Sequence, residues 1–589
     1  MSVLGVRAGQ LLAWQLIVAA GAVALVRSGP VQWVLGGAAL LGVLLTVPRW
    51  HHRWAYEWLG TAWGFRRARL PGLVVTQAKV RTCADAGIVH DGDGFAVMLT
   101  LRPKRTSGAP AELPMASLAP LLDPADDLVS AVQVVMQDDL AASDPAFWPA
   151  TAYTELGYHR VPRSQTAWVA LRHDPRAAGS SHGPAPKAAS LIRALAGRGL
   201  RVTDLTGDLV LSAELVGAGP ARQFLRQSML APEPARADQA GAVGLPIHRW
   251  ESWNSQAAQH VTYWLSRWPA AGIHGLQQAL AIVPALSVTT AVTMTRGGRN
   301  GLALTVTIRV CAEPGADRAA IAQAVAGAAA SCSARLVSMD GDHAAGVLAT
   351  LPIGRGPATA AGWAGRHAEG PGRLATVLTV TPGGVVLGEE AGAAGAGQHI
   401  AWPAFAAATG THSAVIGDRL LPRLLAVRAL ATGARLHVVT SQPDGWLALR
   451  GSAGMPAGRM TVARPGTQPP PDGTSASPWM IIDETRSPAA IARRPWQAIV
   501  TVLGSGQDVP AALPSPDAIL LQRTTSRGAA AVIAALGLSS SIAPALERMP
   551  DDVVAVATPG SVRFAGLAPH RSERAALTQS LRQPAATGS

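Results

Sequence analysis

The chain has few of the residues that build metal centres or disulfide-linked folds. Its 589 residues include three cysteines, Cys83, Cys311 and Cys332, and their spacing matches no metal-ligand pattern. Three cysteines cannot form a disulfide framework either, which is compatible with a reducing compartment. We therefore expect no structural zinc, no other metal and no cofactor.

Lysine is also scarce, since it occurs only at Lys79, Lys104 and Lys187. The net charge of +13 comes from arginines spread along the whole chain, and this pattern argues against specific nucleic-acid binding. No GxxxxGK[ST] phosphate loop occurs either. Its absence argues against nucleotide hydrolysis at Asp483 and Glu484, the acidic pair that ends the apolar run WMIIDE.

Two uncharged apolar runs, Leu11 to Val26 and Val31 to Val47, occupy most of the first fifty residues. Each would extend roughly 25 Å as a helix, a little less than the roughly 30 Å hydrocarbon core, so flanking residues must help. The connection Arg27-Ser28-Gly29-Pro30 has room only for a tight turn. The runs predict a transmembrane hairpin over residues 1–49, with helices at about 10–27 and 31–48.

Arginines follow the second run, whereas the connection contains only Arg27. By the positive-inside rule, we expect a protein of the cell (inner) membrane whose body is cytoplasmic. The alternative is a signal peptide cleaved after Ala20-Gly21-Ala22, but a second apolar run directly behind it disfavours release. The residues predicted to anchor the chain in lipid and to form its interface are Arg7, Trp14, Arg27, Trp33, Gly36, Gly37, Gly42, Arg49, Trp50, Arg53, Trp54, Trp58, Arg66, Arg67 and Arg69.

Residues 50–72 are rich in tryptophan and arginine. Trp50, Trp54 and Trp58 recur at the spacing of one helix face, which predicts a helix lying at the membrane interface. Alternatively, these tryptophans form the first layer of a soluble core. Both interpretations can hold for different tryptophans.

The remainder alternates strand and helix patterns, which predicts an α+β and α/β fold. Residues 122–137 are expected to be helical. We expect a first α+β domain at 73–240 and a second α+β unit at 241–353, whose similar order of strands and helices suggests a weak internal duplication. A Gly-rich linker at 354–372 is expected to precede a C-terminal α/β domain at 373–575 with a mostly parallel sheet. Residues 576–589 are expected to be a disordered tail.

No coherent catalytic set is found. The triplets Asp91-Gly92-Asp93 and Asp340-Gly341-Asp342 could hold a divalent ion with a nucleotide sugar, but Asp-Gly next to strands more often forms a hairpin turn. Asp418 is expected to cap a helix rather than to bind a ligand. His343 has no companion at metal-ligand spacing.

The layout resembles the EccE component of actinobacterial type VII secretion systems. The similarity covers roughly residues 1–270 and lies in the hairpin, its WHHRW and FRRAR tail, GIVHDGDGFAVMLTL, SQTAWVALRHDP and SWNSQAAQHVTYWLSRWP. It implies a non-enzymatic membrane subunit of a translocon that contains EccB, EccC and EccD. The alternative is a membrane-tethered, glycosyltransferase-like enzyme that uses a nucleotide sugar at one of the Asp-Gly-Asp triplets.

Overall fold

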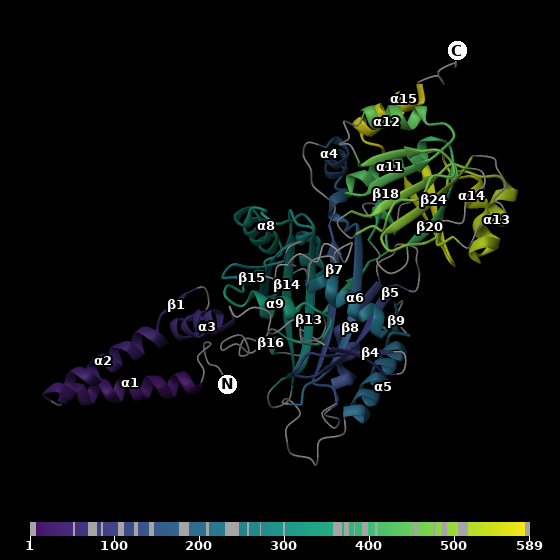
Figure 1. Cartoon of the computed structure of the whole chain (residues 1–589). Helices are drawn as coiled ribbons and strands as arrows, with labels where there is room; N and C mark the ends of the chain where they lie inside the picture. The colour runs from purple at the N-terminus through teal and green to yellow at the C-terminus, as the bar shows by residue number, and fades with distance from the viewer. Residues whose placement is uncertain are drawn as a thin grey trace.

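The computed structural model comprises a helical hairpin, a large central sheet and a C-terminal α/β domain (Figure 1). The prediction of a mixed α+β and α/β fold is confirmed. The structure describes residues 8–26, 28–50, 53–68, 79–83, 86–103, 111–122, 128–140, 147–175, 188–207, 211–229, 247–255, 258–270, 272–297, 301–356, 368–369, 376–381, 383–391, 399–406, 410–452, 458–474, 477–485, 492–504 and 516–582.

The hairpin consists of α1 (Ala8–Val26) and α2 (Pro30–Thr46). Gly29 adopts a φ of +103°, which only glycine tolerates well, and Pro30 starts α2 because its missing N–H needs no partner there. A short antiparallel ladder of β1 (Arg49–Trp50) and β2 (Arg53–Trp54) leads into α3 (Ala55–Ala68). Of the helices in the described ranges, none combines the length and apolar character needed to cross a membrane.

The central sheet is built from two units with the same order of elements. The first contains β5 (Phe95–Pro103), η1 (Met115–Leu122), β7 (Ala131–Asp139), β8 (Ser164–His173), α5 (Ala188–Gly207) and β9 (Leu211–Leu215). The second contains β12 (Gln259–Arg267), α7 (Gly272–Leu280), β13 (Ser287–Gly297), β14 (Gly301–Ala312), α8 (Arg318–Ser331) and β15 (Arg335–Ser338). Each is a β-α-β-β-α-β motif in which a 3-10 helix replaces the first α-helix of the first unit.

The two units join edge to edge in a single sheet. Their strands lie in the order β9-β5-β8-β7 and β13-β14-β12-β15, all neighbours are antiparallel, and β7 pairs with β13 at the centre. Val135 lies opposite Ala291 at the middle of this ladder, so the arrangement is nearly two-fold symmetric. The units predicted at 73–240 and 241–353 therefore share one sheet. The similar order of strands and helices predicted for the two units is also present in the structure.

Four short strands extend the edges of this sheet, and one helix follows each unit. The strands are β3 (Lys79–Cys83), β4 (Ala86–His90), β10 (Ile247–Arg249) and β11 (Ser252–Asn254). The helices are α6 (Ala218–Met229) and α9 (His343–Ala349). The main core packs η1, α5, α7 and α8 against one face, whereas Leu225 of α6 and Leu348 of α9 lie together in a smaller cluster on the other.

The helix predicted over residues 122–137 is wrong, because Ala131–Asp139 is the central strand β7. This strand pairs on both edges and is buried on both faces, so its apolar residues run almost without interruption. Periodicity alone cannot distinguish such a strand from a buried helix.

The C-terminal domain contains a ten-stranded mixed sheet. A parallel part has the order β22 (Met460–Ala463), β21 (Arg435–Val439), β23 (Trp479–Asp483), β24 (Gln497–Gly504), β20 (Thr411–Gly417), β25 (Ala518–Leu521). Antiparallel β26 (Val553–Thr558), β27 (Ser561–Gly566), β18 (Val385–Glu390) and β19 (His399–Trp402) continue it. The predicted parallel character therefore holds for only part of the sheet.

Helices cover both faces of this mixed sheet. One face is covered by α11 (Leu420–Ala431), α12 (Asp444–Ser452) and α15 (Arg571–Arg582), whose apolar residues share a core with the strands. On the other face lie α13 (Ser526–Leu536) and α14 (Ala543–Glu547). The predicted disordered tail at 576–589 is thus wrong for residues 576–582, which are helical; the rest of the tail lies outside the described residues.

The chain crosses twice between the central sheet with its helices, called the central body below, and the C-terminal domain. The predicted domain boundaries miss both crossings. β17 (Val377–Val380) pairs with β6 (Ala111–Pro114), so the first residues described after the Gly-rich stretch belong to the central body. Conversely, the β7–β8 arm, residues 147–163 with α4 (Trp148–Glu155), packs into the C-terminal domain. Most of the predicted linker at 354–372 lies outside the described residues.

Several polar contacts fix the β7–β8 arm in place. The Tyr153 hydroxyl accepts a hydrogen bond from the Val386 N–H at 3.0 Å, and the Arg163 guanidinium donates to the Thr432 carbonyl at 2.7 Å. Glu155 pairs with His570 of the C-terminal domain at 2.7 Å. These contacts hold the C-terminal domain against the central sheet.

Candidate membrane and assembly interface

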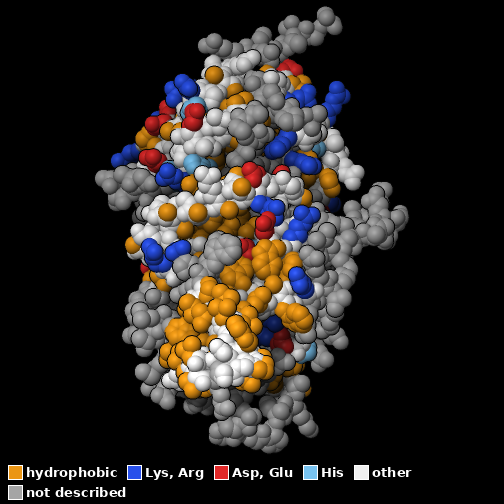
Figure 2. All heavy atoms as spheres, turned by 90° about the vertical axis from the view of Figure 1, so that its left-hand side faces the viewer, with side chains coloured by type: hydrophobic (Ala, Val, Ile, Leu, Met, Phe, Trp, Pro, Cys, Tyr) orange, Lys and Arg blue, Asp and Glu red, His pale blue; other side chains and the backbone are white. Residues whose placement is uncertain are grey.

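The hairpin presents a large apolar surface. Most of the large hydrophobic side chains that the described residues expose lie on α1 and α2, and Figure 2 shows them as one continuous patch on the face toward the viewer. Leu25 and Val26 are each 86% exposed, and Trp33 near the hairpin turn is 80% exposed. Contiguous exposed apolar patches often mark surfaces that contact a protein or a membrane.

The three predicted glycine contacts differ in their surroundings. A Cβ added at Gly42 would lie 2.7 Å from Cγ1 of Ile17, so this glycine allows α1 and α2 to approach closely. A Cβ at Gly36 or Gly37 would meet nothing within 4 Å. Gly42 therefore packs the hairpin internally, whereas Gly36 and Gly37 face away from the partner helix.

One face of α3 connects the hairpin with the central body. Trp54, just before α3, makes an edge-to-face contact with Trp14 of α1, with ring centroids 6.4 Å apart. One turn further, Trp58 stacks on Trp250 at 5.8 Å, and Phe65 meets the same indole edge-to-face at 5.3 Å. Trp54 therefore contacts the hairpin, and the half-buried Trp58 contacts the central body.

The surface that receives α3 is the turn between β10 and β11 together with the second Asp-Gly-Asp turn. The Gly341 N–H donates to the Trp250 carbonyl at 2.6 Å. A Cβ at Gly341 would lie 2.6 Å from the Thr61 side chain and 2.8 Å from the Trp250 ring, so only glycine allows this close approach. Trp250 and Gly341 were missed from the sequence, because nothing local connects them with residues 55–68.

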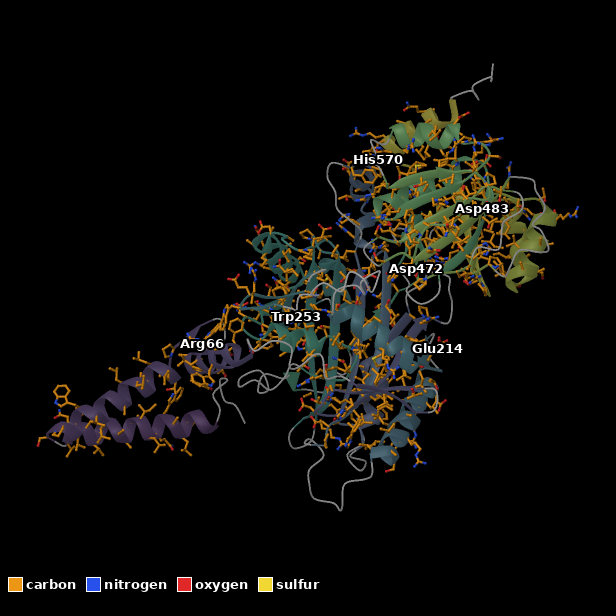
Figure 3. All side chains as sticks on the ribbon, viewed as in Figure 1. Arg66, Glu214, Trp253, Asp472, Asp483 and His570 are labelled. Atoms are coloured by element: carbon orange, nitrogen blue, oxygen red, sulfur yellow. The ribbon has the colours of Figure 1, made fainter. Side chains whose placement is uncertain are left out.

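The opposite face of α3 has a different character. Leu59 is 58% exposed and Trp63 61% exposed, and Arg66, labelled in Figure 3, is exposed on the same side. Residues spaced by four and then three positions lie on one helix face. An apolar residue, a tryptophan and an arginine on that face are typical of a helix at the boundary between lipid and water.

The other predicted anchoring residues are only partly described. Arg49 and Trp50 lie in β1, Arg53 in β2 and Arg67 in α3, where the structure describes their backbone. Arg7, Arg27 and Arg69 lie outside the described residues.

The first Asp-Gly-Asp triplet is a turn whose carboxylates bind arginine. Gly92 has a φ of +87°, and Asp91 Oδ1 accepts hydrogen bonds from the N–H groups of Asp93 and Gly94. Arg172, which is buried, contacts Asp91 at 2.7 Å, and Arg355 contacts Asp93 at 2.8 Å. Burial raises the pKa of Asp91, but the hydrogen bond and the positive charge of Arg172, with that of Arg355, outweigh it and leave the pKa below its usual value.

The second triplet is also structural. Gly341 has a φ of +78°, and the Asp342 N–H donates to the Met339 carbonyl at 2.7 Å. His343 is fully buried, and its Nδ1 accepts from the Thr262 N–H at 3.1 Å. The first triplet forms the predicted hairpin turn between β4 and β5, whereas the second forms a turn between β15 and α9 rather than a hairpin.

At the carboxyl ends of β20 and β23, where α/β folds usually bind ligands, two carboxylates bind neighbouring groups of the chain itself. Asp418 Oδ1 accepts from the N–H groups of Leu420 and Leu421 at 2.9 and 3.2 Å, so it caps α11 as predicted. Gln522 Oε1 accepts from the Asp418 N–H at 2.8 Å and covers the turn. Asp483, labelled in Figure 3, is buried and accepts from the Thr485 N–H and hydroxyl at 2.8 and 2.6 Å.

No cluster of three or more metal-binding side chains occurs within the residues that the structure describes. No protein-family model matches the chain, and no curated protein is significantly similar to it. The hairpin with α3 is the most extensive exposed apolar feature of the described residues.

Proposed function

We propose that this chain is a non-enzymatic membrane subunit of a type VII protein secretion translocon. In this proposal the α1–α2 hairpin enters the bilayer, α3 lies at its surface, and the two bodies contact other subunits from the cytoplasm. The partners are membrane lipid and the components EccB, EccC and EccD. The resemblance of residues 1–270 supports the choice of translocon, and the exposed apolar hairpin supports membrane attachment.

The apolar patch is the structural observation that carries membrane attachment in this proposal. At about 1.5 Å per residue, α1 and α2 would extend roughly 28 and 25 Å, slightly less than a typical hydrocarbon core. A short hairpin can be accommodated by local thinning of the bilayer or by neighbouring helices. The open surface at Gly36 and Gly37 is suited to such a neighbour, because small residues let helices approach closely in lipid.

The nucleotide-sugar alternative has less support. It needs free carboxylates to hold a metal ion and a diphosphate, but Asp91 and Asp93 contact Arg172 and Arg355 instead. We therefore propose an assembly role rather than a catalytic one.

Membrane attachment can be tested with matched charge substitutions. Leu12→Glu with Leu40→Glu places carboxylates at positions that are 60 and 61% exposed on the hairpin. Leu200→Glu with Ile282→Glu makes the same change at positions 54 and 53% exposed on the central body. We expect the first double variant to be released from membranes in alkaline extraction and flotation, and the second to stay bound. If neither variant is released, or if both are released equally, the hairpin is not the membrane anchor.

Assembly requires a separate experiment. The full chain carrying an affinity tag is purified from mildly solubilised native membranes. We expect a hexameric ATPase and a multi-spanning channel protein to co-purify, and Gly37→Leu to reduce their recovery without releasing the chain from the membrane. A lone protein with metal-dependent nucleotide-sugar turnover would refute the translocon assignment.

A further inference from the structure

A cleft of about 350 Å³ opens at the edge of the central sheet, beside the start of α8. It is lined by Arg249, Asn254, Gln259, Gly315, Ala316 and Arg318. The lining contains two guanidinium groups and two amides and no carboxylate. This set of groups differs from the apolar lining of most small-molecule pockets and favours a charged, polar ligand.

The polar groups of the cleft come from one face of the sheet. Arg249 lies opposite Ser252, and Asn254 lies opposite Gln259, so the three lining side chains project from the same side of β10, β11 and β12. Val261, two residues after Gln259, packs in the core with Ile321 of α8. The cleft therefore begins where the apolar contact between α8 and the sheet ends.

Two amide atoms in this cleft have no hydrogen-bond partner among the described residues. Gln259 is only 6% exposed, yet its Nε2 donor is unpaired, and so is the buried Oδ1 acceptor of the adjacent Asn254. An unpaired buried polar group destabilises the protein, and a ligand that hydrogen-bonds to it removes that cost. A neighbouring donor and acceptor of this kind suit the hydroxyl groups of a polyol.

The charges define the other part of the ligand. Arg249 has no carboxylate partner in the described part of the chain. Arg318 forms an ion pair of 2.6 Å with Glu251, which does not line the cleft. Asp317 caps the first N–H groups of α8, at 2.9 Å from the Ala319 nitrogen, so the cations rather than the helix terminus attract an anion. Paired guanidinium groups bind phosphate through several N–H donors at once.

We propose that this cleft binds a phosphate ester with hydroxyl groups, such as a glycerol phosphate. The phosphate contacts Arg249 and Arg318, and the hydroxyl groups contact Asn254 and Gln259. The ester can be a soluble metabolite or the headgroup of an anionic lipid. The second source is compatible with the neighbouring Trp250, on which α3 rests.

Binding to the full chain in detergent is measured by isothermal titration with three probes: inorganic phosphate, glycerol 3-phosphate and dihexanoyl phosphatidylglycerol. We expect at least one ester to bind more tightly than inorganic phosphate. Arg249→Gln should weaken ester binding about tenfold or more and should leave the fold intact, because Arg249 is exposed. Asn254→Ala should remove the preference for the ester over inorganic phosphate.

The matched control is Arg548→Gln, which removes an exposed arginine from the C-terminal domain. Binding of glycerol 3-phosphate identifies a soluble ester as sufficient, whereas binding of the phosphatidylglycerol probe alone identifies a lipid headgroup; both results support the site. No ester binding, or an equal loss in Arg249→Gln and Arg548→Gln, would overturn it. These binding measurements are independent of whether the hairpin attaches the chain to a membrane.

Discussion

Arg428 and Glu573 form a two-point ion pair inside the C-terminal domain. Nε and Nη2 of Arg428 lie 3.1 and 3.2 Å from the two carboxylate oxygens of Glu573, and the guanidinium is fully buried. The same guanidinium donates to the carbonyl groups of Val386 and Leu387 in β18 and lies 5.2 Å from the ring of Tyr158. One side chain of α11 thus connects α15, the antiparallel part of the sheet and the β7–β8 arm.

Removing either charge of this pair should strongly destabilise the C-terminal domain. Glu573→Gln leaves the Arg428 charge buried without its counter-ion, which typically costs 3–5 kcal/mol. We expect a loss of roughly that size in urea unfolding. The exposed pair of Arg523 and Asp551 is the control, because its side chains are 60 and 87% exposed and Arg523→Gln should cost less than about 1 kcal/mol. Similar losses in both variants would contradict the role assigned to burial.

Asp138 should make the protein less stable as the pH rises from about 4 to 7. Burial, together with the charge of Asp139, raises the pKa of Asp138 to about 7, although a hydrogen bond from Gln165 opposes the shift. The folded state then keeps a proton that the unfolded state has released, so the free energy of unfolding falls over this window. Asp138→Asn should reduce this slope and stabilise the protein by a few kcal/mol at pH 8, and the remaining slope comes in part from the neighbouring Asp139, whose pKa burial also raises.

The measurement for Asp138 is urea unfolding of parent and variant between pH 4 and 8. His260, whose pKa burial and the nearby Arg309 lower to about 3, acts in the opposite direction between about pH 3 and 6.5. Its contribution is the same in both proteins and cancels in their difference. A difference that does not grow with pH would show that Asp138 is ionised in the folded state.

Gly42→Leu should separate α1 from α2, because the new side chain would occupy the position of Ile17. Gly36→Leu changes the volume equally but meets no described atom and should leave the hairpin intact. The readout is a disulfide crosslink between cysteines placed at Gly21 and Ala39, whose Cβ positions are 3.9 Å apart in the parent. Equal crosslinking in both variants would show that Gly42 does not set the helix contact.

Trp250→Ala should release α3 from the central body. The substitution removes the ring against which both Trp58 and Phe65 pack, and because Trp250 is half-buried the loss should be smaller than the roughly 3–5 kcal/mol of a fully buried tryptophan. Hydrogen exchange of the α3 amides should accelerate in this variant. Trp63→Ala, on the exposed face of the same helix, should leave that exchange near the parent rate. Unchanged exchange in Trp250→Ala would mean that α3 is held by other contacts.

Local patterns predicted many elements well. The runs GFAVMLTLRP and ALSVTTAVTMTR predict β5 and β13, because short runs rich in apolar and β-branched residues are typical of strands, although both strands are buried on both faces. Asp-Gly turns and the Asp418 cap were also predictable, since a turn or a cap depends on residues only a few positions apart. Residues 131–139 were misassigned because burial on both faces removed the period.

The sequence indicated only one side of the contacts that α3 makes with the hairpin and the central body. Trp54 and Trp58 stood out as aromatic residues near an apolar run, but their partners are Trp14, forty positions before Trp54, and Trp250, far along the chain. The helix that supplies Glu573 lies partly in a stretch expected to be disordered, since its polar composition gives little local signal. Its apolar residues Ala576 and Leu577 become buried only against the C-terminal domain.

By itself, the sequence determined the elements whose signals are local: the two apolar helices and their turn, the alternating strands, the Asp-Gly turns and the excess of arginine. The tertiary structure decided which of these elements meet. It joined two repeated units through β7 and β13, moved the β7–β8 arm into the C-terminal domain and brought Trp58 onto Trp250. These choices depend on burial and hydrogen bonding between residues separated by tens to hundreds of positions, for which no local pattern exists.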